Sequence, residues 1–163
     1  MITSQSQQHY VRDSRSPTPL NETVSKYMRS NKSKNTKPEL LLRKELWKAG
    51  VRGYRLHWKK APGKPDISFP GRKIAIFING CYWHRCPNCN LGLPKNNREF
   101  WKQKFERNVE RDKEKVAALE QQNWNVLVIW ECELKSDIQV QVRKVKQLLI
   151  HSSTHWNTHL KYW

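Results

Sequence analysis

The sequence is poor in three things: long apolar runs, cysteine and acidic side chains. No apolar run approaches the roughly 18 residues of a membrane span, and residues 1–20 lack the apolar segment of a secretory signal. We therefore expect no membrane partner and a cytoplasmic protein. The four cysteines all lie between Cys81 and Cys132. In a reducing compartment, so few cysteines in one part of the chain favour a metal site over disulfides.

Acidic residues are outnumbered, because 14 Asp and Glu stand against 31 Lys and Arg and leave a formal net charge of +17. Phosphate contacts from Lys and Arg release counterions, so a chain this basic is typical of nucleic-acid-binding proteins. The alternative is a basic surface that serves solubility alone. With 163 residues and no internal repeat, we expect a single domain at residues 21–151, between a disordered basic arm (1–20) and a tail (152–163).

The apolar pattern predicts an α/β domain with a mixed sheet flanked by helices. Helical spacing and capping residues indicate helices at residues 21–34, 36–49, 96–122 and 137–150. Strands are expected at residues 53–58, 66–69, 73–78 and 124–130. The last strand has apolar residues on both faces, which predicts a place in the middle of the sheet. In the second helix, Trp47 is expected on the buried side together with Leu42 and Leu46.

The residues suited to chemistry gather in the segment 64–89, KPDISFPGRKIAIFINGCYWHRCPNC, where two strands run into a loop rich in Cys and His. A closed tetrahedral zinc site needs four ligands. Four thiolates are available from Cys81, Cys86, Cys89 and Cys132. We therefore predict a structural Zn²⁺, and the alternative is four cysteines without a metal.

Five short segments together resemble the very short patch repair (Vsr) endonucleases, which nick DNA beside a T:G mismatch. They occur in that family's order and at close to its spacing: GKPD at 63–66, GCYWH at 80–84, EFW at 99–101, NVERD at 108–112 and WEC at 130–132. The resemblance implies a restriction-endonuclease-like core that acts on double-stranded DNA as a monomer. It also implies a place at the bacterial nucleoid and a functional link to a cytosine-5 DNA methyltransferase.

Asp66, after Pro65 at the start of a strand, is the candidate ligand for a catalytic Mg²⁺, because that ion prefers hard oxygen ligands. The alternative is an ordinary turn aspartate. Nucleases of this core usually add Glu-x-Lys on the next strand, but residues 77–79 (FIN) contain neither an acid nor a lysine. His84 is then the candidate general base, since an unperturbed imidazole titrates near neutral pH. The alternative role for His84 is zinc ligation.

The resemblance implies further site residues. It matches Asp112 to an acid that orients His84, and it places Glu39 near the active site, although residues 36–39 also form a capping-box pattern. The family carries Thr-His, or Thr-Asp, where this chain has Ile78 and Asn79. A backbone oxygen of Ile78 can still bind Mg²⁺, whereas Asn79 supplies neither a carboxylate nor an imidazole. The family's zinc site usually includes a His, where this chain has Cys86.

The resemblance also implies contacts to DNA. Met28 matches a residue that enters the minor groove, and apolar side chains inserted between base steps kink a duplex. Three side chains, which we call the aromatic wedge, match residues that enter beside the mispair: Tyr82, Trp83 and Trp101. For Met28 and the wedge, the alternative is packing in the core. Asn79 and Asn108 are further candidates for DNA contacts.

Three functions are compatible with these observations. The first is a Mg²⁺-dependent endonuclease that nicks one DNA strand at a T:G mismatch and leaves a 5′-phosphate. The second is a related restriction or mobile-element nuclease that cuts a specific sequence without a mismatch. The third is a zinc-containing DNA-binding module without catalytic activity. Nicking in Mg²⁺ would exclude the third, and comparison of T:G with T:A duplexes separates the first two.

Overall fold

The computed structural model describes residues 17–19 and 21–152. The arm expected at residues 1–20 and the tail expected at 152–163 therefore lie outside the described residues, apart from 17–19 and 152. Among the helices that are described, none combines the length and the apolar character needed to cross a membrane.

The first of two compact units ends at Asn31 and contains helix α1 (Glu22–Ser30). Asn21 caps this helix, because its side-chain oxygen accepts a backbone N–H at 2.9 Å. The helix is shorter than the expected span of 21–34. Met28 is partly buried within this unit. The second unit contains the sheet and the remaining helices.

A four-stranded mixed sheet forms the centre of the second unit. Its strands are β1 (Arg55–Leu56), β2 (Ile67–Phe69), β3 (Ile74–Asn79) and β4 (Asn125–Trp130), in the order β1-β2-β3-β4. The first two pairings are antiparallel, and β3 pairs with β4 in parallel. The 3-10 turn η1 (Pro70–Arg72) joins β2 to β3. The expected α/β architecture with a mixed sheet is confirmed.

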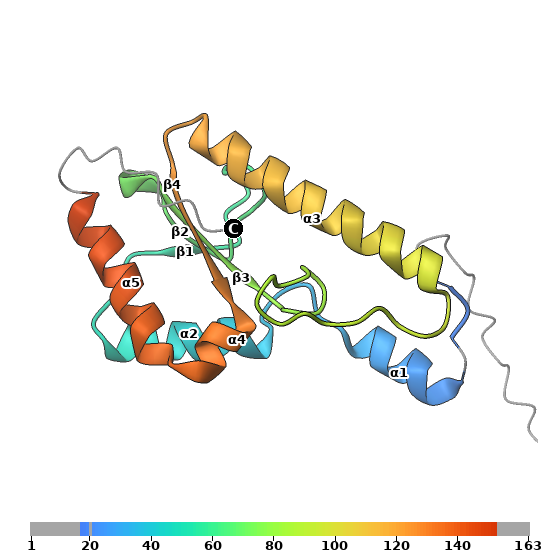
Figure 1. Cartoon of the computed structure of the whole chain (residues 1–163). Coiled ribbons are helices and arrows are strands. Elements are labelled where there is room, and N and C mark those ends of the chain that lie inside the picture. Colours follow the sequence, from blue (N-terminus) through green and yellow to red (C-terminus); the bar gives the residue numbers. More distant parts are fainter. Residues whose placement is uncertain (1–16, 20, 153–163) are drawn as a thin grey trace, which may run out of the picture. The chain divides into compact units, whose positions relative to one another are not determined.

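The prediction that the last strand lies in the middle of the sheet is wrong, because β4 is an edge strand. Helix α3 (Arg98–Glu120) packs on one face of the sheet, and α2 (Lys37–Lys48) and α5 (Ile138–His151) lie on the other (Figure 1). Both faces of β4 are therefore covered, although within residues 17–19 and 21–152 no strand pairs with its outer edge. Apolar residues on both sides of a strand indicate that both faces of the sheet are covered there. They do not indicate whether the strand lies at the edge or in the middle of the sheet.

Helix α2 begins with the expected capping box, in which the Thr36 N–H donates to Glu39 Oε1 at 3.2 Å. Leu42 and Leu46 are fully buried, but the prediction that Trp47 is buried beside them is wrong, because Trp47 is 60% exposed. Its ring is covered instead by the guanidinium of Arg52, which lies 3.4 Å from the ring centroid.

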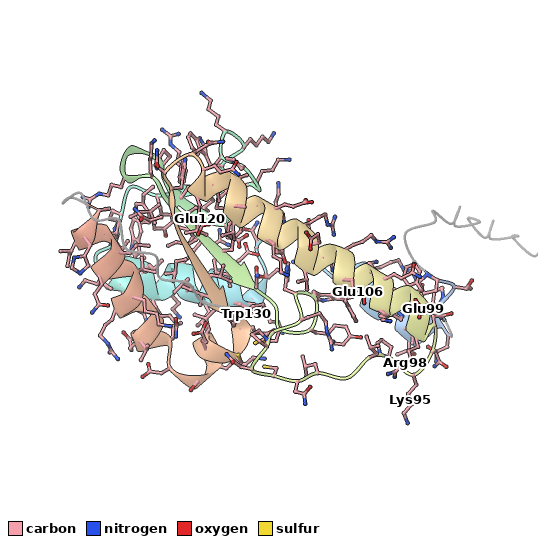
Figure 2. All side chains as sticks on the ribbon, turned by 45° about the horizontal axis from the view of Figure 1, so that its top comes forward. Lys95, Arg98, Glu99, Glu106, Glu120 and Trp130 are labelled. Atoms are coloured by element: carbon pink, nitrogen blue, oxygen red, sulfur yellow. The ribbon has the colours of Figure 1, made fainter. Side chains whose placement is uncertain are left out.

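Helix α3 is 23 residues long and extends past the sheet, with Arg98 and Glu99 at its projecting end and Glu120 at the other (Figure 2). Asn97 occupies its N-cap position in the left-handed region (φ 52°) and makes no side-chain capping bond. An asparagine thus occupies the N-cap position, but its side chain does not cap the helix. At the projecting end the helix packs against the cysteine-rich loop that follows β3.

The C-terminal part of the described chain contains one helix more than expected. The short helix α4 (Glu131–Ser136) follows β4 directly, and α5 follows it after Asp137. Asp137 caps α5 by accepting two backbone N–H groups, at 2.8 and 3.1 Å. Val142 and Val145 of α5 are buried against the sheet, as its amphipathic pattern predicts.

Candidate active site and metal centre

Asp66 lies where β2 begins, opposite the end of β3. Its Oδ2 accepts the backbone N–H of Ile78 at 2.7 Å, which is a consequence of the antiparallel pairing of the two strands. Burial raises the pKa of Asp66 to about 6, and the Ile78 hydrogen bond opposes this only in part. Because the hydrogen bond from Ile78 offsets only part of the cost of burying the negative charge of Asp66, this carboxylate is suited to bind a cation.

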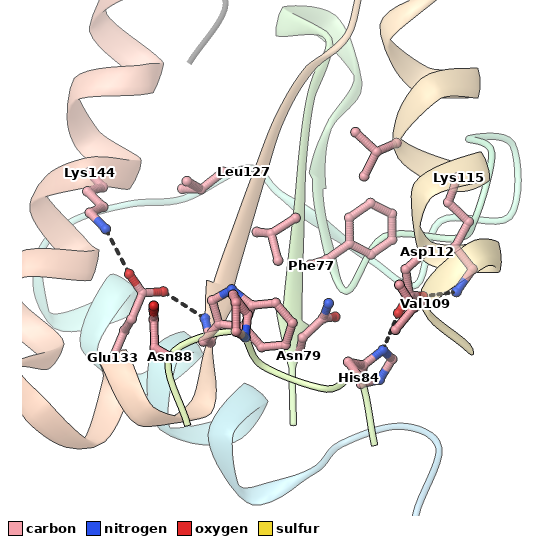
Figure 3. Close-up of a pocket in the computed structure, with 14 residues that line it drawn as sticks. Phe77, Asn79, His84, Asn88, Val109, Asp112, Lys115, Leu127, Glu133 and Lys144 are labelled. Carbon is pink, nitrogen blue, oxygen red and sulfur yellow. Dashed lines mark hydrogen bonds and ion pairs between the residues drawn. The ribbon is translucent and has the colours of Figure 1, made fainter. Parts of the chain in front are cut away.

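His84 and Asp112 form a pair beside Asp66. The side chain of His84, from the loop after β3, shares a short hydrogen bond through Nδ1 with Asp112 Oδ2 on α3 (Figure 3). Burial disfavours the ionised form of Asp112, but hydrogen bonds from His84 and Lys115 outweigh burial and hold its pKa below the usual value. An ionised Asp112 fixes the proton of His84 on Nδ1, so Nε2 is left with a free electron pair.

Lys115 is a site residue that the sequence analysis missed. Its Nζ lies 2.9 Å from Asp112 Oδ1. Its positive charge also opposes a small part of the rise that burial causes in the pKa of Asp66. Its stem passes over Gly63, where an added Cβ would lie only 2.5 Å from Lys115 Cγ. Gly63 is also in the left-handed region, with φ of +68°. The spacing of three residues from Asp112 on a helix was the one signal in the sequence that could have identified Lys115.

Glu39 forms the expected capping box and also lies close to His57 and Asp66. The capping box of α2 is present, and the same side chain is only 4% exposed with its Oε2 lying 3.5 Å from His57 Nε2. His57 in turn approaches Asp66, since its Nδ1 is 3.7 Å from Asp66 Oδ1. The ligand atoms of Glu39, His57 and Asp66 all lie within 4.8 Å of one another. His57, the second residue that the sequence analysis missed, shows no signal beyond its residue type.

A cavity of about 250 Å³ opens beside the His84–Asp112 pair and runs along β4 (Figure 3). Asn79 faces it, and the ion pair of Glu133 with Lys144 (3.1 Å) closes its far end. Val109 and Val116 of α3 are half-buried and line this cavity. The site therefore combines charged groups at two ends with an apolar wall between them.

The four cysteines converge at the carboxyl ends of β3 and β4. Because these strands are parallel, Cys81 after β3 and Cys132 after β4 lie next to each other, and the Cys132 N–H donates to Cys81 Sγ at 3.3 Å. The four sulfurs are within 4.8 Å of one another. Cys86 Sγ and Cys132 Sγ are 3.7 Å apart, close to the roughly 3.8 Å that Zn–S bonds of about 2.3 Å give at tetrahedral angles. The cysteines therefore fit a tetrahedral zinc ion.

The residues of the aromatic wedge pack together with Phe105 of α3. Ring centroids of Trp83 lie 5.2 Å from Tyr82 and 6.0 Å from Trp101. Trp101 is only 8% exposed, whereas Tyr82 and Trp83 are partly exposed. Asn108 donates from Nδ2 to the backbone oxygen of Trp83 at 3.1 Å, which holds the loop against α3. Within the second unit, Tyr82 and Trp83 thus have surface to offer a ligand.

Comparison with known proteins finds a family and relatives that are all named as DNA endonucleases or nicking enzymes. Residues 20–91 match the family described as "DNA mismatch endonuclease Vsr". The chain is 43% identical over 123 residues to the type II nicking enzyme V.XorIIP of Xanthomonas oryzae pv. oryzae, covering 75% of this chain and 88% of that one. It is 40% identical over 147 residues to V.NaeI of Lentzea aerocolonigenes (87% and 86%). It is 34% identical over 113 residues to the mismatch endonuclease Vsr of Escherichia coli (69% and 72%).

These relatives, together with an oriented imidazole beside a buried carboxylate, establish the class of the protein as a DNA endonuclease, which is a hydrolase. The identity to Vsr of Escherichia coli extends over more than two thirds of the chain. The chain therefore belongs to the Vsr family. Membership confirms the resemblance drawn from the five sequence segments and the nuclease-like α/β fold that it implied.

Proposed function

We propose that the protein is a Mg²⁺-dependent endonuclease that nicks one strand of double-stranded DNA at a T:G mismatch and leaves a 5′-phosphate. The observation that carries this proposal is the hydrogen bond between His84 and Asp112 beside Asp66, in a chain of the Vsr family. A general base oriented by a carboxylate, next to a second carboxylate that can bind a metal, suits hydrolysis of a phosphodiester.

Each residue of the site has a distinct role in this proposal. Asp66 and the backbone oxygen of Ile78 are the Mg²⁺ ligands, and a bound Mg²⁺ neutralises charge on the scissile phosphate. His84 takes the proton of the attacking water at Nε2, the nitrogen that its bond to Asp112 leaves free. Asp112 orients the ring, and Glu39 places a further carboxylate next to the site.

The four cysteines, by this proposal, bind one structural Zn²⁺. Four thiolates complete a tetrahedral site and leave no position for water, so this ion takes no part in the reaction. Its place at the ends of β3 and β4 supports a structural role, because it would tie the loop that carries His84 to the sheet.

The partner is double-stranded DNA, bound by a monomer. The net charge of +17 supports binding to phosphates. Specific contacts are assigned to the aromatic wedge, to Asn79 in the cavity, to Asn108 beside Trp83 and to Met28 of the first unit. A mispaired step unstacks at low cost, so inserted aromatic rings favour a mismatch over paired DNA.

The proposal also includes the biological setting that the family resemblance implies. A T:G mismatch is the product of deamination of 5-methylcytosine, which is the reason for a functional link to a cytosine-5 DNA methyltransferase. Repair of chromosomal DNA places the protein in the cytoplasm, at the bacterial nucleoid.

A second candidate function is sequence-specific nicking that requires no mismatch. Two observations favour it: several relatives are named type II nicking enzymes, and Asn79 stands where the Vsr repair enzymes carry His or Asp. The third candidate, a DNA-binding module without activity, predicts no cleavage under any condition.

The test is nicking of two duplexes that differ only in one pair, T:G against T:A, with enzyme in excess and with or without Mg²⁺. Our proposal predicts nicking of the T:G strand at least about 100-fold faster, consistent with the few kcal/mol that a mismatch saves on unstacking. Equal rates on the two duplexes would favour the sequence-specific nuclease. Absence of cleavage of either duplex in Mg²⁺ would contradict both.

A further inference from the structure

The roles proposed above do not explain why His57 lies between Glu39 and Asp66. His57 follows β1 directly, and its backbone N–H donates to the carbonyl of Asp66 at 3.3 Å. Its φ is +46°, in the left-handed region, which costs a residue other than glycine roughly 1–3 kcal/mol. The side chain is only 14% exposed. The surrounding structure therefore stabilises an unfavourable backbone conformation that turns this imidazole inward.

The imidazole lies between two carboxylates. Its Nδ1 is 3.7 Å from Asp66 Oδ1, and its Nε2 is 3.5 Å from Glu39 Oε2. All three ligand atoms lie within 4.8 Å of one another. Bonds of about 2.0–2.2 Å to one ion give separations of roughly 3–4 Å between its ligands, so small movements suffice to bring the three groups onto one cation.

Glu39 accepts hydrogen bonds from Asn35 and Thr36, and Asp66 accepts one from Ile78, but the hydrogen bonding of His57 is incomplete. His57 Nε2 is buried and, among the described residues, has no hydrogen-bond partner in acceptable geometry. A buried polar atom without a partner is unfavourable by about 1–3 kcal/mol. Glu39 and Asp66 also place two carboxylates beside the same imidazole, with their ligand atoms within 4.8 Å of each other, so their negative charges repel. A cation at this position would relieve both conditions.

We propose that His57 is a direct ligand of the catalytic metal, which Glu39, His57 and Asp66 bind as one mixed nitrogen-and-oxygen site. One ring nitrogen binds the ion while the other faces a carboxylate, as in most metal-bound histidines. Mg²⁺ is a hard cation that prefers an all-oxygen shell, whereas Mn²⁺, a softer transition-metal ion that also accepts oxygen ligands, tolerates one imidazole better than Mg²⁺ does. The site therefore binds Mn²⁺ more tightly than Mg²⁺. This inference rests on the proposed role of Asp66 as a metal ligand.

The test measures metal binding without DNA, on the full chain with its zinc retained. Binding of Mn²⁺ is followed by the loss of the free-ion EPR signal, and binding of Mg²⁺ by competition. We expect at least about tenfold tighter binding of Mn²⁺ than of Mg²⁺, and loss of most of this preference in His57→Gln. His151→Gln, at the last turn of α5, is the matched control and should retain the preference.

A spectroscopic measurement on the wild-type chain avoids dependence on the folding of a variant. Electron spin echo modulation of bound Mn²⁺ should show a directly bonded histidine nitrogen, and labelling of histidine with ¹⁵N should change that modulation. The signal should persist in His84→Gln and disappear in His57→Gln. Absence of nitrogen modulation, or its persistence in His57→Gln, would overturn the inference.

The two proposals can fail separately. If Asp66→Ala abolishes metal binding and nicking while His57→Gln binds both ions like the wild type, the inference about His57 is wrong and the proposed function stands. If Asp66→Ala binds the ions and nicks DNA at the wild-type rate, the metal site is misplaced and both proposals are contradicted.

Discussion

At the scale of single residues, the candidate site contains two carboxyl groups whose surroundings shift their pKa values in opposite directions. Asp66 is buried with few hydrogen bonds, and its pKa is raised to about 6. Asp112 is bonded to His84 and Lys115, and its pKa is lowered despite burial. This separation of the two pKa values supports the different tasks that we propose for them, in which Asp66 receives a cation and Asp112 stays ionised and orients His84.

The raised pKa of Asp66 predicts a pH-dependent gain in stability for Asp66→Asn. The folded state holds the proton up to about pH 6, whereas the unfolded state releases it near 3.8, so the unfolding free energy falls as pH rises between these values. Without added divalent ion, Asp66→Asn should be more stable than the wild type at pH 8, by at most about 3 kcal/mol. The two should be equally stable at pH 4. Urea unfolding at the two pH values measures the difference.

Asp112→Asn is the control for this prediction because its shift has the opposite sign. The lowered pKa of Asp112 means that its ionised form stabilises the fold, and this contribution is lost as pH falls through the folded-state pKa. Asp112→Asn should therefore be less stable than the wild type at pH 8. A loss of stability at pH 8 in both variants would show that burial of Asp66 does not disfavour its charge.

Residue type and position suggested Asp66 and His84, and the resemblance to the Vsr family added Asp112 and Glu39; in the structure Glu39 and His84 act on the charge of Asp66, and His84 is bonded to Asp112. His57 and Lys115 escaped prediction for a physical reason. Each reaches the site through three-dimensional placement, His57 by an unusual backbone conformation and Lys115 by packing of its stem over Gly63. The arrangement of His57 produces no local pattern in the sequence, and Lys115 is marked only by its spacing of three residues from Asp112 on α3.

At the scale of elements, helices α2 and α5 agreed with prediction because their capping residues and apolar stripes are local properties. The errors concern relations between elements. Trp47 was expected on the buried side with Leu46 but is exposed, because successive helical residues point about 100° apart. The position of β4 in the sheet depends on which strands pair, and its own residues do not encode that order.

The packing of α3 against the cysteine-rich loop leads to a prediction for Trp83. This ring packs against Trp101 and Phe105 but remains partly exposed, so part of its surface is available to contact DNA. Trp83→Ala should weaken binding to a T:G duplex more than to a T:A duplex, by roughly 1–3 kcal/mol for one stacking contact. Trp47→Ala, which removes an exposed tryptophan of α2, should affect both duplexes alike.

Fluorescence anisotropy with the two duplexes, combined with thermal unfolding, separates the two explanations for Trp83. Equal losses of affinity for T:G and T:A, together with a lower Tm, would show that Trp83 belongs to the core and not to a DNA-contacting wedge.

At the scale of the whole molecule, the four cysteines of the proposed zinc site join parts of the chain that are distant in sequence. Cys81, Cys86 and Cys89 belong to the loop that carries His84, and Cys132 begins α4 after the last strand. Because a structural metal contributes to folding, its loss should destabilise the unit and displace the catalytic base together.

Cys132→Ser should therefore lose bound zinc, about 2 kcal/mol or more of stability and most of the nicking activity. A change of this size lowers Tm by roughly 4–8 °C in a chain of this length. Cys86→His is the matched control, because imidazole is also a zinc ligand and the Vsr family usually carries a His there. Elemental analysis of the purified wild-type protein that finds no zinc would contradict the assignment.

The central claim is the division of labour between Asp66 and His84, and single-turnover nicking of a T:G duplex at saturating enzyme tests it most directly. Measured across Mg²⁺ concentration and pH, Asp66→Ala and His84→Ala should each lower the rate at least about 1,000-fold while DNA affinity stays within a few-fold, since affinity comes mainly from Lys and Arg. Asp112→Asn should be milder, because it disturbs the orientation of His84 without removing it. Cleavage by His84→Ala at a rate near that of the wild type would contradict the account.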